Sequence, residues 1–256
     1  MAADDAHVPD WRDAAAYAPL LEAERSLLAW EWLRRNPRYR VSAERAVEAG
    51  DRRTASDIGP GEWGLHAFVP PEMVVPDVRP VWRSEVYPYV LRVEAAPASG
   101  EDDFDVEQLA LSSTLVTSGD GREHLLISDG LRAIRIDVLG GSVAHGPAEL
   151  RFKLAGLASL EHQVLTLRRL IAVWKSGAFC RSLHPIETRA KRWVLMLRTA
   201  DALAAGADQR DIATALLNAE AHLPRWRAQS PSLRTRVQRL VRSARAMESG
   251  GFWTLL

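Results

Sequence analysis

Residues 231–248 read PSLRTRVQRLVRSARAME, and this stretch decides the fold of the carboxyl-terminal part of the chain. Ser230 and Pro231 predict a helix start, because serine caps helices and proline fits their first turn. The glycine pair Gly250-Gly251 predicts the end of the helix at about Glu248. Apolar residues recur at helical spacing on one face: Leu233, Val237, Leu240, Ala244 and Met247. The stretch therefore predicts an amphipathic helix that packs through this face.

The opposite face of this predicted helix is rich in arginine. Between Arg225 and Met247 there are seven arginines and no acid. An arginine fork can bond guanine edges or phosphates, and a glutamine amide can read adenine. We therefore predict a DNA-binding face in the major groove, made of Arg234, Thr235, Gln238, Arg239, Arg242 and Arg245. The alternatives are a face that is only solvated, or one that docks on an acidic protein surface.

The helices before this stretch fit a variant helix-turn-helix. A helix that ends at Gly206 precedes a short helix over residues 209–218, which Asp208 is expected to cap. The connection to the arginine-rich helix has about a dozen residues, longer than the usual three or four. Three arginines are predicted either to touch backbone phosphates or to be plain surface charges: Arg210, Arg225 and Arg227.

The two parts of the chain carry opposite charge, although the formal net charge of the 256 residues is zero. Residues 1–150 hold 15 Lys and Arg against 26 Asp and Glu, a net charge of −11. Residues 151–256 hold 18 against 7, a net charge of +11. A basic half of this kind predicts a polyanion partner, here double-stranded DNA. The alternative is that the two halves complement each other in the fold or within one oligomer.

The middle of the chain changes from helical to strand periodicity. Ile134, Ile136 and Val138 face one way, whereas Arg135 and Asp137 face the other. Two glycine turns, at 119–121 and 129–130, predict hairpins. The strand candidates are 87–93, 113–117, 123–128, 131–139 and 149–154. We therefore predict a small antiparallel β-meander with one solvent-facing side.

The predicted fold class is α+β. Helices are expected over 10–17, 20–35 and 42–49, with a break at Asn36-Pro37. Trp30 and Trp32 are a candidate oligomer contact or, more commonly for such spacing, core. A helix from about 156 to Gly177 has one apolar stripe: Leu157, Leu160, Val164, Leu167, Leu170, Ile171 and Trp174. The predicted domains are an N-terminal helical regulator-like region (1–82), the β region (83–155) and a helix-turn-helix-like DNA-binding domain (156–256).

Several classes of protein are disfavoured by the sequence. It has no apolar run of about 18 residues, so no membrane span is predicted, and its acidic start does not read as a secretory signal. Residues 59–64 match the pattern Gly-x-Gly-x-x-Gly without the strand and helix that a dinucleotide loop needs. Cys180 is alone, and the seven histidines never fall at ligand spacing. We expect a cytoplasmic protein that is no enzyme and uses no cofactor or metal.

Two stretches resemble a proteobacterial family of transcriptional activators whose known types are RovC and FseA. The first holds Asp10-Trp11-Arg12-Asp13, Tyr17, the string AWEWLRRNPRY over 29–39, and Trp63-Gly64-Leu65. The second holds Leu197, Asp201, Gly206, Arg210, Ile212-Ala213, Leu216, Leu233-Arg234, Arg236-Val237, Arg239-Leu240 and Gly250-Gly251-Phe252. The sequence departs where the family often has Gly-Gly-Tyr-Arg, because Trp253 replaces the arginine. The chain therefore lacks the arginine that could contact a phosphate at this position of the tail.

The resemblance implies a C-terminal helix-turn-helix-like DNA-binding domain and an N-terminal regulator-like domain. It further implies an activator linked to a mobile element (an integrative conjugative element) or a type VI secretion locus, a homo-oligomer, and a possible regulatory protein partner. Related stand-alone C-terminal domains act as antiactivators that bind protein. The alternative function is therefore an antiactivator or adaptor whose basic half docks on an acidic partner.

Overall fold

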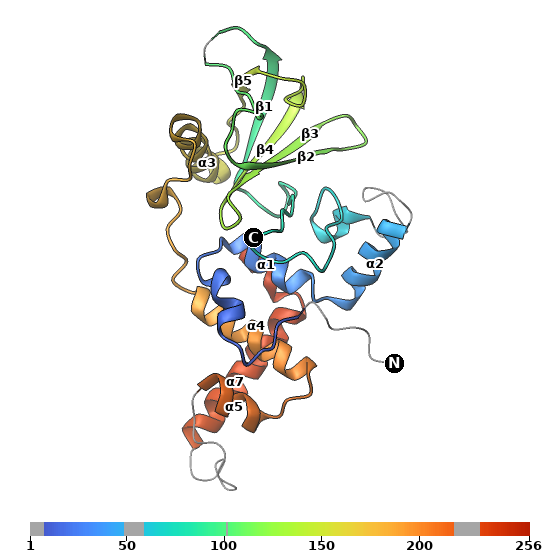
Figure 1. Cartoon of the computed structure of the whole chain (residues 1–256), viewed down its shortest axis with the longest axis vertical. Helices are drawn as coiled ribbons and strands as arrows, with labels where there is room; N and C mark the ends of the chain where they lie inside the picture. The colour runs from blue at the N-terminus through green and yellow to red at the C-terminus, as the bar shows by residue number, and fades with distance from the viewer. Residues whose placement is uncertain (1–7, 49–58, 101, 218–230) are drawn as a thin grey trace. The chain divides into compact units, whose positions relative to one another are not determined.

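A computed structural model describes residues 8–48, 59–100, 102–217 and 231–256 (Figure 1). Contacts divide the chain into two compact units. We call Met1–Leu33 with Ile186–Leu255 the helical unit, and Arg34–Pro185 with Leu256 the sheet unit. This division differs from the predicted boundaries at 82 and 155, which follow changes in sequence pattern and stay a proposal about domains. Mixed helices and strands confirm the α+β class.

The helical unit joins both ends of the sequence. From the N-terminal part come η1 (Ala15–Leu21) and α1 (Arg25–Leu33). From the C-terminal part come α4 (Ala190–Ala204), α5 (Gln209–Leu217), α7 (Pro231–Glu248) and η4 (Gly251–Leu255). The predicted arginine-rich helix is thus confirmed with its bounds, whereas the predicted helix over 20–35 is split between η1 and α1.

One core of the helical unit is built from segments far apart in sequence. Trp11, only 3% exposed, packs with Ile212 of α5 and with Val237 and Val241 of α7. The backbone around Trp11 is tied to α4, because Arg198 Nε donates to the Trp11 carbonyl at 2.9 Å. Tyr17 adds a buried hydrogen bond of 2.6 Å to Asp201 Oδ2. The N-terminal segment is therefore part of the structure that holds the C-terminal helices.

The tryptophan pair of α1 is core. Trp30 is fully buried and Trp32 is 3% exposed, so the alternative of an exposed oligomer contact is wrong. In the sheet unit, α2 runs over Pro37–Glu48 and begins before the predicted start at 42. Asn36 explains the earlier start, because its Oδ1 accepts the Arg38 N–H at 2.9 Å and proline fits the first turn.

The sheet unit is built on five strands: β1 (Val90–Pro97), β2 (Ser112–Thr117), β3 (Glu123–Ser128), β4 (Ala133–Gly140) and β5 (Ala148–Phe152). Their order is β2-β3-β4-β1-β5. The predicted meander is present over β2, β3 and β4, and β5 pairs antiparallel with β1. The β1–β4 pair is parallel. Alternation along a strand predicts its two faces but not its neighbours, so this pair was not predicted.

One face of the sheet packs against α3 (Leu157–Ser176), as Figure 1 shows. Ile134, Ile136 and Val138 share a core with Leu170 and Val173 of this helix. The opposite face was predicted to meet solvent, and at Arg135 and Asp137 that prediction is wrong. Arg135 is 1% exposed and Asp137 is 5% exposed, because carbonyl and carboxylate acceptors surround the Arg135 guanidinium. Both faces of β3 are likewise buried.

None of the helices in the described ranges combines the length and apolarity that crossing a bilayer needs.

Candidate nucleic-acid interface

The position of α7 is set by its apolar face. It contacts α4, α5 and η4. Val237 and Ala244 are fully buried, Val241 and Met247 nearly so, and Leu233 and Leu240 pack at the edge of the same core. The predicted apolar face is therefore confirmed, with Val241 as an additional member. Because this face is fixed against the unit, the arginines on the other side are directed outward.

The predicted DNA-contacting side chains of α7 lie together on its exposed side. Gln238 is half-buried, and the others are exposed: Arg234, Thr235, Arg239, Arg242 and Arg245. Within the described residues, no ion pair joins the guanidinium of any of these arginines to a carboxylate. Four cationic side chains on one helix face are thus available to a polyanion.

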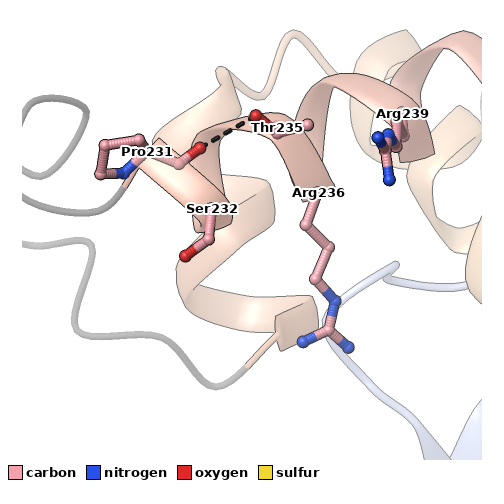
Figure 2. Close-up of a pocket in the computed structure, with 5 residues that line it drawn as sticks. All are labelled: Pro231, Ser232, Thr235, Arg236 and Arg239. Carbon is pink, nitrogen blue, oxygen red and sulfur yellow. Dashed lines mark hydrogen bonds between the residues drawn. The ribbon is translucent and has the colours of Figure 1, made fainter.

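The first turns of α7 form a hollow of about 570 Å³. Figure 2 shows Thr235 folded back on its own helix, where its Oγ1 donates to the Pro231 carbonyl at 3.0 Å. Arg236 extends away from the helix beside Ser232, and Arg239 lies one turn further on. Arg236 is exposed and was not predicted as a site residue. Arg236 belongs to the same run of arginines, but on the helical wheel it lies next to the apolar face. For that reason it was not assigned to the arginine-rich face.

Glu248 is the acid at the C-terminal end of α7. Burial raises the pKa of Glu248 above its ordinary value, and the charge of Asp201 acts in the same direction. The charge of Arg245 lowers the pKa of Glu248 and so opposes both.

Of the three arginines before α7 that were predicted to contact phosphates, only Arg210 lies within the described residues. Arg210 is exposed in the first turn of α5. The predicted cap of that helix is present, since Asp208 Oδ1 accepts the N–H groups of Arg210 at 2.6 Å and Asp211 at 2.9 Å. Ser230, Arg225 and Arg227 lie outside the described residues. The order α4, α5, α7 agrees with the predicted helix-turn-helix-like arrangement, and these three helices contact one another.

Comparisons with known families give the class of the protein. Residues 155–256 match the family described as T6SS, Transcription factor, DNA binding domain. Residues 10–66 match the family described as Proteobacterial transcriptional regulator-like domain. No curated protein matches the chain. The two matches support the role of a transcriptional regulator with a DNA-binding domain.

More particularly, the chain joins a regulator-like domain at its N-terminal side to the type VI secretion transcription factor DNA-binding domain at its C-terminal side, which confirms the predicted resemblance. Both matched ranges cross the boundary between the helical and the sheet unit. Helix α3, for example, lies in the matched DNA-binding range and belongs to the sheet unit.

A second polar group lies in the sheet unit. His124 of β3 stands opposite Asp137 of β4, and the His66 ring stacks on the His124 ring with centroids 3.4 Å apart. One ligand atom from each of these three residues lies within 4.8 Å of the others, close enough to consider a metal ion. Sequence spacing did not predict this group, because only the register of β3 and β4 brings His124 and Asp137 together.

The geometry of this group is that of an internal hydrogen-bond network. Asp137 Oδ1 accepts from Arg135 Nη2 at 2.8 Å and from His124 Nδ1 at 2.7 Å, so the carboxylate already has cationic and polar partners. The histidine rings are stacked and only 20° from parallel, so their in-plane lone pairs lie in two separate, nearly parallel planes, which does not favour shared binding of one ion. This arrangement stabilises the buried Arg135.

Burial and neighbouring charges shift the pKa values of two residues in the network, His66 and Asp137. Burial lowers the pKa of His66 to about 3, and the positive charges of His124 and Arg135 act in the same direction. Although burial opposes ionisation of Asp137, the hydrogen bond from His124 and the charge of Arg135 lower its pKa to about 2. At neutral pH the network therefore holds a neutral His66 and an ionised Asp137.

Proposed function

We propose that the protein binds double-stranded DNA through α7, as a cytoplasmic activator of a mobile-element or secretion locus, and that it works as a homo-oligomer without a chemical step or cofactor. One observation carries the proposal: the exposed arginines of α7 project from a helix whose other face is fixed in a core. In this proposal α7 lies in the major groove with Arg234, Thr235, Gln238, Arg239, Arg242 and Arg245 toward the DNA. Arg210, Arg225 and Arg227 contact backbone phosphates, and Arg236 adds a further phosphate contact.

The salt dependence of binding tests this proposal. If about five arginines neutralise phosphates, the logarithm of affinity falls against the logarithm of salt concentration with a slope of roughly −4 to −5. The double variant Arg239→Ala, Arg242→Ala removes two of these contacts. We expect weaker DNA binding and a shallower slope, with unchanged thermal unfolding because both side chains are exposed.

The matched control is Arg38→Ala, Arg45→Ala, which removes two exposed arginines from the helix α2 of the sheet unit. We expect this control to bind DNA like the wild type. Equal affinity of the wild type and the α7 double variant would remove α7 from the DNA interface.

A second candidate function is an antiactivator or adaptor that binds an acidic protein. The opposite net charges of residues 1–150 and 151–256 favour it, because the basic half suits any strongly acidic surface. A gel shift with excess random duplex at two salt concentrations separates the two functions. Salt-dependent binding to duplex supports the DNA-binding regulator, and no binding at either concentration supports the adaptor.

A further inference from the structure

The sheet unit exposes an apolar surface on α3 and the end of β5. Ten large hydrophobic residues are exposed in the described part of the chain, and six of them fall between residues 152 and 174. We call these six the α3 surface: Phe152 (39% exposed), Leu154 (42%), Leu157 (89%), Val164 (41%), Ile171 (43%) and Trp174 (43%). Scattered apolar side chains are normal on a surface, whereas apolar side chains that adjoin one another, as Phe152, Ile171 and Trp174 do around one groove, mark an interaction site.

The α3 surface is distinct from the face through which α3 packs on the sheet. Leu170 and Val173 make the buried contacts, while Leu157, Val164 and Ile171 repeat every seven residues on the exposed side. A repeat of seven residues keeps side chains in line along a helix, as in helix pairs. A groove of about 350 Å³ is lined by six apolar residues and two acids: Phe104, Leu150, Phe152, Leu170, Ile171, Trp174, Asp102 and Glu149.

Two of the charges beside this line complement each other. Glu161 and Arg168 are both exposed on the face of α3 that carries Val164. Along the helix, Glu161 precedes Val164 by three residues and Arg168 follows it by four. In an antiparallel pair of α3 helices with a twofold axis at about Val164, Glu161 of each copy meets Arg168 of the other. The same axis places Leu157 of one copy near Ile171 of the other, since both lie seven residues from Val164. A parallel pair in register would not pair Glu161 with Arg168, because the two residues stay seven positions apart along the common axis.

We propose that the α3 surface binds a second copy of this chain, with the two α3 helices antiparallel about a twofold axis at Val164. A twofold interface needs one patch that complements itself, and apolar and charged side chains satisfy this condition with the same axis. This proposal rests on the homo-oligomer of the proposed function and identifies the surface through which its copies contact each other. It rests on no DNA contact, since α3 contributes none of the proposed DNA-binding residues.

The first test uses the full chain without DNA. Sedimentation equilibrium of the wild type is compared with Val164→Glu, which places two carboxylates face to face at the axis. We expect a concentration-dependent dimer for the wild type, and at least a tenfold weaker dimer for the variant at about 0.15 M salt. The matched control is Val41→Glu, which adds the same charge at an exposed valine of α2 and leaves the dimer unchanged.

Circular dichroism checks that both variants fold like the wild type. A wild type that stays monomeric at roughly 100 μM, where even weak specific contacts associate, overturns the proposal. A dimer that Val164→Glu leaves intact also overturns it, because the contact then lies on another surface.

The second test reads the register of the pair. Glu161→Arg places like charges opposite each other twice, and so does Arg168→Glu, so each variant is expected to dimerise about five- to tenfold more weakly at low salt. The double variant restores opposite charges and is expected to return to within about threefold of the wild type. A double variant that is no better than the single variants overturns the antiparallel arrangement. Loss of DNA binding with an intact dimer would count against the proposed function alone.

Discussion

Helices α3 and α7 are both amphipathic, but their exposed faces differ in chemistry. Each buries one apolar face, α3 against the sheet and α7 against the helical core. The remaining face of α7 carries arginines, whereas the remaining face of α3 carries Leu157, Val164, Ile171 and Trp174. The buried face of an amphipathic helix fixes where it sits, and the residues of its free face determine which partner it suits: a polyanion for α7 and an apolar surface for α3.

The largest expected effect tests what holds α7 in place. Trp11→Ala should destabilise the helical unit by about 3–5 kcal/mol, because it removes a nearly fully buried indole from the core that contains Val237. Chemical denaturation followed by circular dichroism measures the change. A matched control is Trp174→Ala, whose side chain is 43% exposed on α3 and should cost much less. Equal losses for the two variants would contradict the role of Trp11.

A pair of valines compares the two helices directly. Val237→Ala removes methyl groups from a fully buried site on α7 and should cost about 2 kcal/mol. Val164→Ala removes the same atoms from a half-exposed site on α3 and should cost less than about 0.5 kcal/mol. Urea unfolding at a protein concentration where the wild type is monomeric gives both values. A larger loss at Val164 than at Val237 would reverse the comparison.

The sequence predicted local features of this molecule better than distant contacts. The bounds of α7 and β3 were predicted because caps, glycines and alternation are all local signals. The exposed arginines of α7 followed from the same wheel that gave its buried face. Trp11 was not placed in the helical core, because nothing local relates it to residues two hundred positions later.

The errors have a common physical cause. Alternation separated Arg135 from Ile134 and Ile136, but the carbonyl acceptors that bury Arg135 come from Trp82 and Leu125, on other segments. The apolar stripe of α3 was predicted correctly as a stripe, yet the sheet covers only part of it. A pattern gives the chemistry of a face, whereas tertiary contacts decide whether that face is covered.

Acid should affect the sheet unit through His66. Its pKa of about 3 in the folded state lies below the ordinary value of 6.5, so the unfolded chain binds more protons between these two values. The contribution of His66 to the free energy of unfolding is therefore fully present above pH 6.5, and it is lost as the pH drops toward 3. His66→Gln cannot titrate, and its stability should fall less steeply between about pH 6.5 and 4. Urea unfolding at several pH values measures the slope, and an unchanged slope would exclude His66 as its source.

The smallest expected effect concerns the contribution of a single arginine of α7, Arg236, to DNA binding. Arg236 stands at the border between the apolar and the cationic face, in the hollow of the first turns. If it contacts a single phosphate, Arg236→Ala should reduce the salt slope of DNA binding by about 0.9 and weaken all sequences to the same few-fold extent. Arg236→Lys should recover most of the loss, because a phosphate contact needs a charge but not a fork. A loss confined to one DNA sequence would instead make Arg236 a base-reading residue and widen the face that enters the groove.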